Sequence, residues 1–271
     1  MERIRNARGN EVELRPVTAE EIIACGGRIA RRLSATREIL GVMAIGSCAY
    51  GKPDAFSDLD LRVFGQAREG LVDRICEICT EMGGKRDDDA TTIHFPLDSP
   101  AYLFDGLCVE FEVLDPSSVD EQIEDVLNCK QLDAGLMHAL RTGQVLFDRH
   151  GDITRLQERL GTLPYPEKYL DWIRSVALDC PMKLLIQSVH RGDYAQAMEW
   201  LVKFYYDCLF ILFARNAQFF PGRKRALLQT VRQLPHVPEG FCEFWEKVLS
   251  SGVSDRQQVI DYAHGLVNEL K

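Results

Sequence analysis

Short apolar runs and amphipathic stretches alternate in the first half of the chain. Residues 40–45 form a continuous apolar run, which is typical of a strand buried on both faces. Residues 58–64 alternate between charged and apolar positions, which predicts a strand with one buried face. Further strands are predicted at 91–95 and 107–114. Residues 1–16 alternate around a turn signal and predict either a short hairpin or a loose arm.

Helices are predicted between these strands. Thr18 and Glu21 have the spacing of a capping box, so a helix is expected to begin there and to run to about Ser34. A second helix is predicted over residues 69–82, because the apolar positions recur at helical spacing and a pair of glycines follows as a C-cap.

The second half of the chain is mostly helical in pattern. Helices are predicted over 117–128 and 132–141, followed by a short edge strand over 143–148. The remaining residues show helical periodicity only, and 193–216 is the longest such run. The pattern therefore predicts a mixed α/β region followed by an all-helical region, with the boundary near Gly151.

Composition fits a two-domain globular protein. The chain has 271 residues, of which 46% are hydrophobic and 27% charged. Its net charge of -9 argues against a general nucleic-acid binder, which needs a basic surface. No apolar run approaches the length of a membrane span. Nine scattered cysteines without a signal sequence indicate a reducing, cytoplasmic location.

Cys76 and Cys79 form a C-x-x-C pair, but no second pair follows at the spacing of a zinc site. Both lie on the apolar stripe of the helix predicted over 69–82. We therefore interpret them as core thiols, with a metal or redox pair as the alternative.

Four acidic residues on two predicted strands are the strongest chemical signal. Asp58 and Asp60 are two positions apart, so their side chains project from the same face and can converge on one site. Two divalent ions about 3.5–4 Å apart are the usual device for in-line nucleotidyl displacement. Hard cations require several oxygen ligands, so a third carboxylate is needed. Glu110 or Glu112 can supply it, and the other is expected at the surface or paired with Arg62.

A small turn directly precedes these acids. Gly46 allows the backbone to approach a phosphate closely, and Ser47 adds a hydroxyl donor. Lys52, in the following loop, is a candidate to neutralise triphosphate charge, with a solvated surface lysine as the alternative. The glycine-rich patterns of P-loop and dinucleotide-binding proteins are absent from this sequence, so a nucleotide here would be bound more through metals than through a glycine-rich cradle.

In this order, Gly46-Ser47, then Ser57-Asp58-Leu59-Asp60, then Val109-Glu110-Phe111-Glu112 resemble the hG[GS]…DhD…h[DE]h signature of the DNA polymerase beta-like nucleotidyltransferase superfamily. The resemblance covers roughly residues 36–114. The helical remainder is similar in plan to the small-molecule branch, which includes aminoglycoside and lincosamide antibiotic nucleotidyltransferases.

The resemblance implies a short mixed sheet flanked by helices in a catalytic domain, residues 1–150, followed by a helical substrate-binding domain, residues 151–271. It implies two Mg²⁺ ions, bound by Asp58, Asp60 and a third acid that binds metal or serves as general base. Glu110 is favoured over Glu112 because it directly follows an apolar run.

Candidate nucleotide contacts are assigned to Gly46, Ser47, Lys52, Ser57 and Lys203. Lys203 lies among aromatic residues of the longest predicted helix, and the alternative is a surface lysine whose stem packs on the helix.

The function implied is transfer of a nucleoside monophosphate, AMP from ATP in the first instance, to a hydroxyl of an unidentified small molecule, with release of pyrophosphate. One alternative is a protein or tRNA acceptor, as in toxin–antitoxin nucleotidyltransferases. Another is a non-catalytic nucleotide-binding homologue, which the three acid positions argue against. A homodimer is compatible with the sequence, and a membrane partner is not expected.

Overall fold

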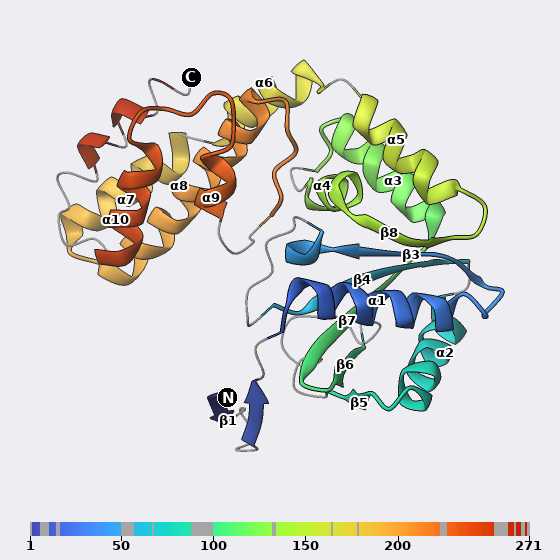
Figure 1. Ribbon diagram of the computed structural model, residues 1–271. Helices are drawn as coiled ribbons and strands as arrows, with labels where there is room; N and C mark the ends of the chain where they lie inside the picture. Colours follow the sequence, from blue (N-terminus) through green and yellow to red (C-terminus); the bar gives the residue numbers. More distant parts are fainter. Residues whose placement is uncertain are drawn as a thin grey trace. The chain divides into compact units, whose positions relative to one another are not determined.

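The computed structural model describes residues 2–5, 11–14, 17–49, 57–66, 68–87, 100–131, 134–163, 165–177, 179–222, 227–251, 260–262, 264–266 and 269. Its elements, labelled in Figure 1 where there is room, are β1 (Glu2–Arg5), β2 (Glu11–Leu14), α1 (Ala19–Leu33), β3 (Ile39–Ile45), the 3-10 turn η1 (Gly46–Cys48), β4 (Leu59–Gly65), α2 (Arg68–Glu81), β5 (Lys85–Arg86), β6 (Ala101–Phe104), β7 (Leu107–Leu114), α3 (Pro116–Leu127), α4 (Gly135–Thr142), β8 (Gln144–Asp148), α5 (Asp152–Thr162), α6 (Glu167–Ala177), α7 (Asp179–Arg191), α8 (Tyr194–Arg215), α9 (Leu227–Val231) and α10 (Phe241–Ser251).

Six strands form one sheet in the order β5-β6-β7-β4-β3-β8. The central strands β4 and β7 run parallel, and the other neighbouring strands are antiparallel. The predicted short mixed sheet is therefore confirmed. The strands β1 and β2 pair separately as an antiparallel ribbon, which confirms the hairpin alternative for the first residues.

Helices α1 and α2 cover one face of this sheet. The apolar side chains of β4 and β7 that face them, including Leu61, Val63 and Phe111, are buried with apolar residues of both helices in one core. Alternation then places the charged residues of the same strands on the opposite face. The capping box predicted for α1 is present, with Glu21 N–H donating to Thr18 Oγ1 and Thr18 N–H donating to Glu21.

The opposite face is covered at one end by α5. The Cβ of any residue other than glycine at position 41 of β3 would lie 1.9 Å from Cδ1 of Ile153 in α5, so a glycine is required where this helix packs on the strand. Helix α5 therefore buries the end of this face where β4 and β7 finish. The acidic residues lie at the opposite end, where these two strands begin.

The chain divides into two compact units, residues 1–123 with 139–163 and residues 124–138 with 164–271. In the second unit the long helix α8 packs against α6 and α7. Trp245 of α10 is fully buried and lies against the rings of Phe204 and Tyr205 from α8. From residue 165 onward, every regular element in the described part of the chain is a helix, as predicted.

Two differences from the predicted elements concern the sheet and the boundary. The strand predicted at 91–95 lies outside the described residues, whereas β5 and β6 were not predicted. Helix α5 groups with the sheet, although the predicted helical domain begins at residue 151. The two-domain division at residue 150 stays a prediction.

Candidate active site

Three carboxylates converge where β4 and β7 begin. In the parallel register of these strands Asp60 lies opposite Glu110, and Asp58 immediately precedes β4. Asp58, Asp60 and Glu110 each offer an oxygen atom, and these atoms all lie within 4.8 Å of one another. We call these three residues the acid triad.

The apolar residues between the acids fix this arrangement. Leu59, Leu61 and Val109 are fully buried against the face covered by α1 and α2. A shift of either strand by one residue would expose these side chains and bury the carboxylates, so the hydrophobic pattern determines which face carries the acid triad.

Gly46 is placed against the acid triad by the turn that follows β3. Its φ of +73° lies in the left-handed region that favours glycine. A Cβ at this position would lie 2.3 Å from Oδ2 of Asp60. Glycine is therefore needed both for the turn and for the close approach of the Asp60 carboxylate, which joins the two halves of the predicted motif in one site.

Two cysteine thiols lie beside the acid triad. Burial raises the pKa of Cys48 to about 11, a hydrogen bond with Ser47 lowers it, and the Asp60 and Asp58 carboxylates raise it further. The Cys48 Sγ–H donates to the carbonyl oxygen of Asp58 at 3.4 Å. Burial also raises the pKa of Cys108, with Glu110 as the largest charge contribution. Both thiols are therefore neutral near pH 7 and add no negative charge to the site.

The donor set of the acid triad fits a hard divalent cation. All three groups are carboxylates, half-buried and close enough for one ion to bind all of them. Oxygen-only sites suit Mg²⁺ or Mn²⁺, whereas zinc sites more often include imidazole or thiolate ligands.

Glu112 occupies a different position from Glu110. It lies opposite Arg62 in the parallel register and forms an ion pair with it. The structure thus brings Glu110 into the acid triad and pairs Glu112 with Arg62, which is the alternative expected for whichever glutamate lies outside the site.

The other candidate residues fall in three groups. Ser57 is buried directly before Asp58, and Ser47 lies in η1 beside Gly46. Lys52 lies outside the described residues. Lys203 belongs to the helical unit, where its ammonium group donates to Asp207 Oδ2 at 2.7 Å. Its assignment to nucleotide binding stays a prediction.

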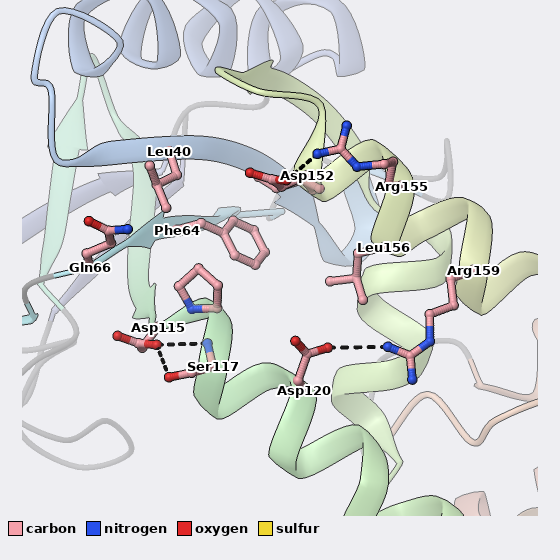
Figure 2. Close-up of a pocket in the computed structure, with 12 residues that line it drawn as sticks. Leu40, Phe64, Gln66, Asp115, Ser117, Asp120, Asp152, Arg155, Leu156 and Arg159 are labelled. Atoms are coloured by element: carbon pink, nitrogen blue, oxygen red, sulfur yellow. Dashed lines mark hydrogen bonds and ion pairs between the residues drawn. The ribbon is translucent and has the colours of Figure 1, made fainter.

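A cavity of about 630 Å³ lies at the other end of the sheet (Figure 2). Its floor is apolar, and ion pairs between Arg155 and Asp152 and between Arg159 and Asp120 lie around it. It opens beside Phe64 and Asp115, where β4 and β7 end, whereas the acid triad lies where they begin. None of the predicted site residues lines this cavity, so we do not assign the candidate active site to it.

Sequence reasoning missed the two thiols beside the acid triad. Cys108 stands two positions before Glu110 on β7, so the alternation of a strand places both on one face. That spacing was available as a signal. Cys48 follows the Gly46-Ser47 turn, and its approach to Asp58 depends on the pairing of β3 with β4, which sequence spacing does not reveal. Cys76 and Cys79 are free cysteines on α2, and Cys79 is fully buried.

Comparisons with known proteins give structural matches only. No family model and no curated protein matches the sequence. The chain is similar to a nucleotidyltransferase-like protein from Exiguobacterium sibiricum 255-15, with 14% identity and a TM-score of 0.43, covering 92% of this chain and 74% of that one. It is also similar to a spectinomycin adenyltransferase from Enterococcus faecialis, with 14% identity and a TM-score of 0.36, covering 93% and 100%.

A third match is a cytoplasmic RNA terminal U-transferase, with 16% identity and a TM-score of 0.29. It covers 46% of this chain, which spans only 40% of the length of that protein. At these identities and TM-scores the matches do not establish function. The functional proposal below therefore rests on the geometry of the acid triad. In the described residues, no helix is both long and apolar enough to cross a bilayer.

Proposed function

We propose that this protein is a magnesium-dependent nucleotidyltransferase that transfers a nucleoside monophosphate, AMP from ATP in the first instance, to a hydroxyl of a small molecule. The convergence of Asp58, Asp60 and Glu110 beside the Gly46 turn carries this proposal. A divalent cation held there would supply Lewis acidity for displacement at phosphorus, and two ions are the usual arrangement.

Each residue of the site has a role in this proposal. Asp58 and Asp60 hold and orient the cations, and Gly46 lets the backbone approach a phosphate, to which Ser47 and Ser57 can donate hydrogen bonds. The acceptor oxygen forms a bond to the α-phosphorus while the bond to the bridging oxygen breaks and pyrophosphate leaves. The acceptor proton would pass to Glu110 where that carboxylate serves as general base, and to solvent water where it serves as a third metal ligand.

The helical unit is proposed to bind the acceptor. Its described surface carries aromatic side chains that are only partly buried, including Trp172, Tyr206 and Phe210. Aromatic rings of this kind stack on small organic ligands, which supports a small-molecule acceptor. The cytoplasmic location and a homodimer also stay predictions.

Pyrophosphate release tests the proposal. Purified protein is incubated with ATP, Mg²⁺ and a panel of aminoglycosides, lincosamides and sugar phosphates. One or more acceptors should support release, and Asp60→Asn should lower it by a factor of about 10³ or more, because the variant removes a charged metal ligand from the transition state. The matched control is Asp120→Asn, the same chemical change at an exposed residue of α3 beside the cavity at the other end of the sheet, which should retain activity.

Three results would contradict the proposal in different ways. Wild-type turnover by Asp60→Asn, with folding verified by circular dichroism, would exclude the acid triad as the catalytic site. Transfer of label from α-labelled ATP to macromolecules in a lysate, with no small acceptor active, would show that the acceptor is a protein or nucleic acid and not a small molecule. ATP binding without pyrophosphate release under any condition would favour a non-catalytic homologue.

A further inference from the structure

The sheet face that carries the acid triad changes character in regular steps along β4 and β7. Three pairs of residues lie opposite each other on this face, and they are Asp60 with Glu110, Arg62 with Glu112, and Phe64 with Leu114. The last pair is buried and apolar. The ion pair thus separates the acid triad from the packed part of the same face, one step along both strands from the candidate metal ligands.

Arg62 is mostly buried and forms an ion pair with Glu112. Its side chain is 21% exposed and that of Glu112 is 37% exposed, so neither group is fully solvated. On the other side Arg62 faces Met43 of β3, which is fully buried and offers no charge. The Nε of Arg62 is buried and has no hydrogen-bond partner among the described residues. Within the described residues, Glu112 is therefore the carboxylate that neutralises Arg62.

Arg62 also has Glu110 within reach. In the parallel register Glu110 is the diagonal neighbour of Arg62, since it lies opposite Asp60. Neighbouring strands lie about 4.8 Å apart and a parallel strand rises about 3.3 Å per residue, so diagonal neighbours are roughly 8 Å apart at the backbone, a distance that two long side chains can span together. A guanidinium group that moved toward Glu110 would place its positive charge beside the acid triad, where it would compete with a divalent cation for the same oxygens.

We propose that Glu112 is a positioning residue that holds the Arg62 guanidinium away from Glu110 and so keeps the acid triad available to a divalent cation. This inference rests on the proposed function, because it assumes that the acid triad binds metal. It also explains a second acid two positions beyond Glu110 on the same face without making Glu112 a ligand.

Mn²⁺ affinity, measured by calorimetry on the full chain, tests this inference without any need for an acceptor. Glu112→Gln keeps the shape of the side chain but releases Arg62, so Mn²⁺ should bind roughly tenfold more weakly, the effect of one displaced positive charge a few ångströms from the ion. Glu112→Asp retains the charge and should bind Mn²⁺ within about threefold of the wild type.

A second set of variants in the same experiment removes the positive charge of Arg62. The double variant Arg62→Met with Glu112→Gln should recover wild-type Mn²⁺ affinity, because no guanidinium remains to compete. Arg62→Met alone should bind Mn²⁺ at least as tightly as the wild type. If Glu112→Gln does not fold, this variant tests the inference by itself.

The outcomes separate this inference from the proposed function. Unchanged affinity in Glu112→Gln would show that the ion pair is only structural. An equally weak double variant would show that Glu112 is itself a metal ligand. Weakened binding in Arg62→Met would overturn the competition between Arg62 and metal. Each of these results leaves the metal site intact, whereas a wild-type protein that binds no Mn²⁺ would overturn the proposed function as well.

Discussion

At the scale of single residues, the closest constraint on the site is the contact between Gly46 and Asp60. Alanine at position 46 would place Cβ 2.3 Å from Oδ2 of Asp60. The carboxylate is the mobile end of its side chain, so it would rotate away and the chain would still fold. Displacement of a catalytic group by about 1 Å can cost a factor of about 100 in rate, and we expect Gly46→Ala to lose that much pyrophosphate release.

Gly83→Ala is the matched control for Gly46→Ala. Gly83 also has positive φ, +84°, but a Cβ there would meet no atom within 4 Å. Both variants should lose about 1–2 kcal/mol of unfolding free energy from backbone strain, measured by urea denaturation. Only Gly46→Ala should lose activity and Mn²⁺ affinity. Equal activity in the two variants would show that the contact with Asp60 is unimportant for the site.

The residue pattern left open whether Glu110 or Glu112 is the third acid, and the structure places these two side chains differently. Glu110 and Glu112 are two positions apart, so strand alternation places them on the same face and cannot separate them. Their roles differ because β7 pairs with β4 in a register that sets Glu110 opposite Asp60 and Glu112 opposite Arg62. That register is a long-range property of two strands separated by more than forty residues of chain, which local periodicity does not contain.

At the scale of elements, Arg149 anchors the segment that leads into β3. It follows β8, and its guanidinium donates to the carbonyl oxygens of Ser34 and Thr36 at 2.7 and 2.9 Å and to that of Ile39 at 3.0 Å. These bonds satisfy backbone groups in the connection between α1 and β3. The connection therefore depends on one side chain that directly follows β8, the edge strand paired with β3.

Arg149→Met should consequently lower the free energy of unfolding by about 2–3 kcal/mol, because charged hydrogen bonds are lost and partly buried carbonyl groups remain. Urea denaturation measures this change. Arg74→Met is the comparison, since Arg74 is exposed and pairs with Glu77 one turn away on α2. Its loss should cost less than about 0.5 kcal/mol. Similar losses in both variants would contradict the role of Arg149.

Helices and central strands were predictable from the sequence because their patterns are local. The capping box located the start of α1, and apolar alternation located β4 and β7. The strand β6 was missed, although Asp105-Gly106 is a two-residue hairpin signal and both residues have positive φ. The signal was present, but β6 is only four residues long and has no charged residues to mark its alternation.

At the scale of the whole molecule, the two units divide the proposed work. The acid triad lies in the unit built on the sheet, and under the proposed function this unit determines which group is transferred. The helical unit is held by aromatic and aliphatic packing around α8, which periodicity predicts as helices but which has no chemical signature for an acceptor. The sequence therefore supports a proposal for the reaction class but none for the identity of the acceptor.

The central claim is that Asp58, Asp60 and Glu110 together hold a divalent cation. Crystals of the full chain grown with Mn²⁺ and examined by anomalous scattering test it most directly. We expect an anomalous peak within bonding distance of carboxylate oxygens from all three residues, and its loss in Asp60→Asn. Saturating Mn²⁺ with no peak at these residues, or a peak bound by Glu112 in place of Glu110, would contradict it.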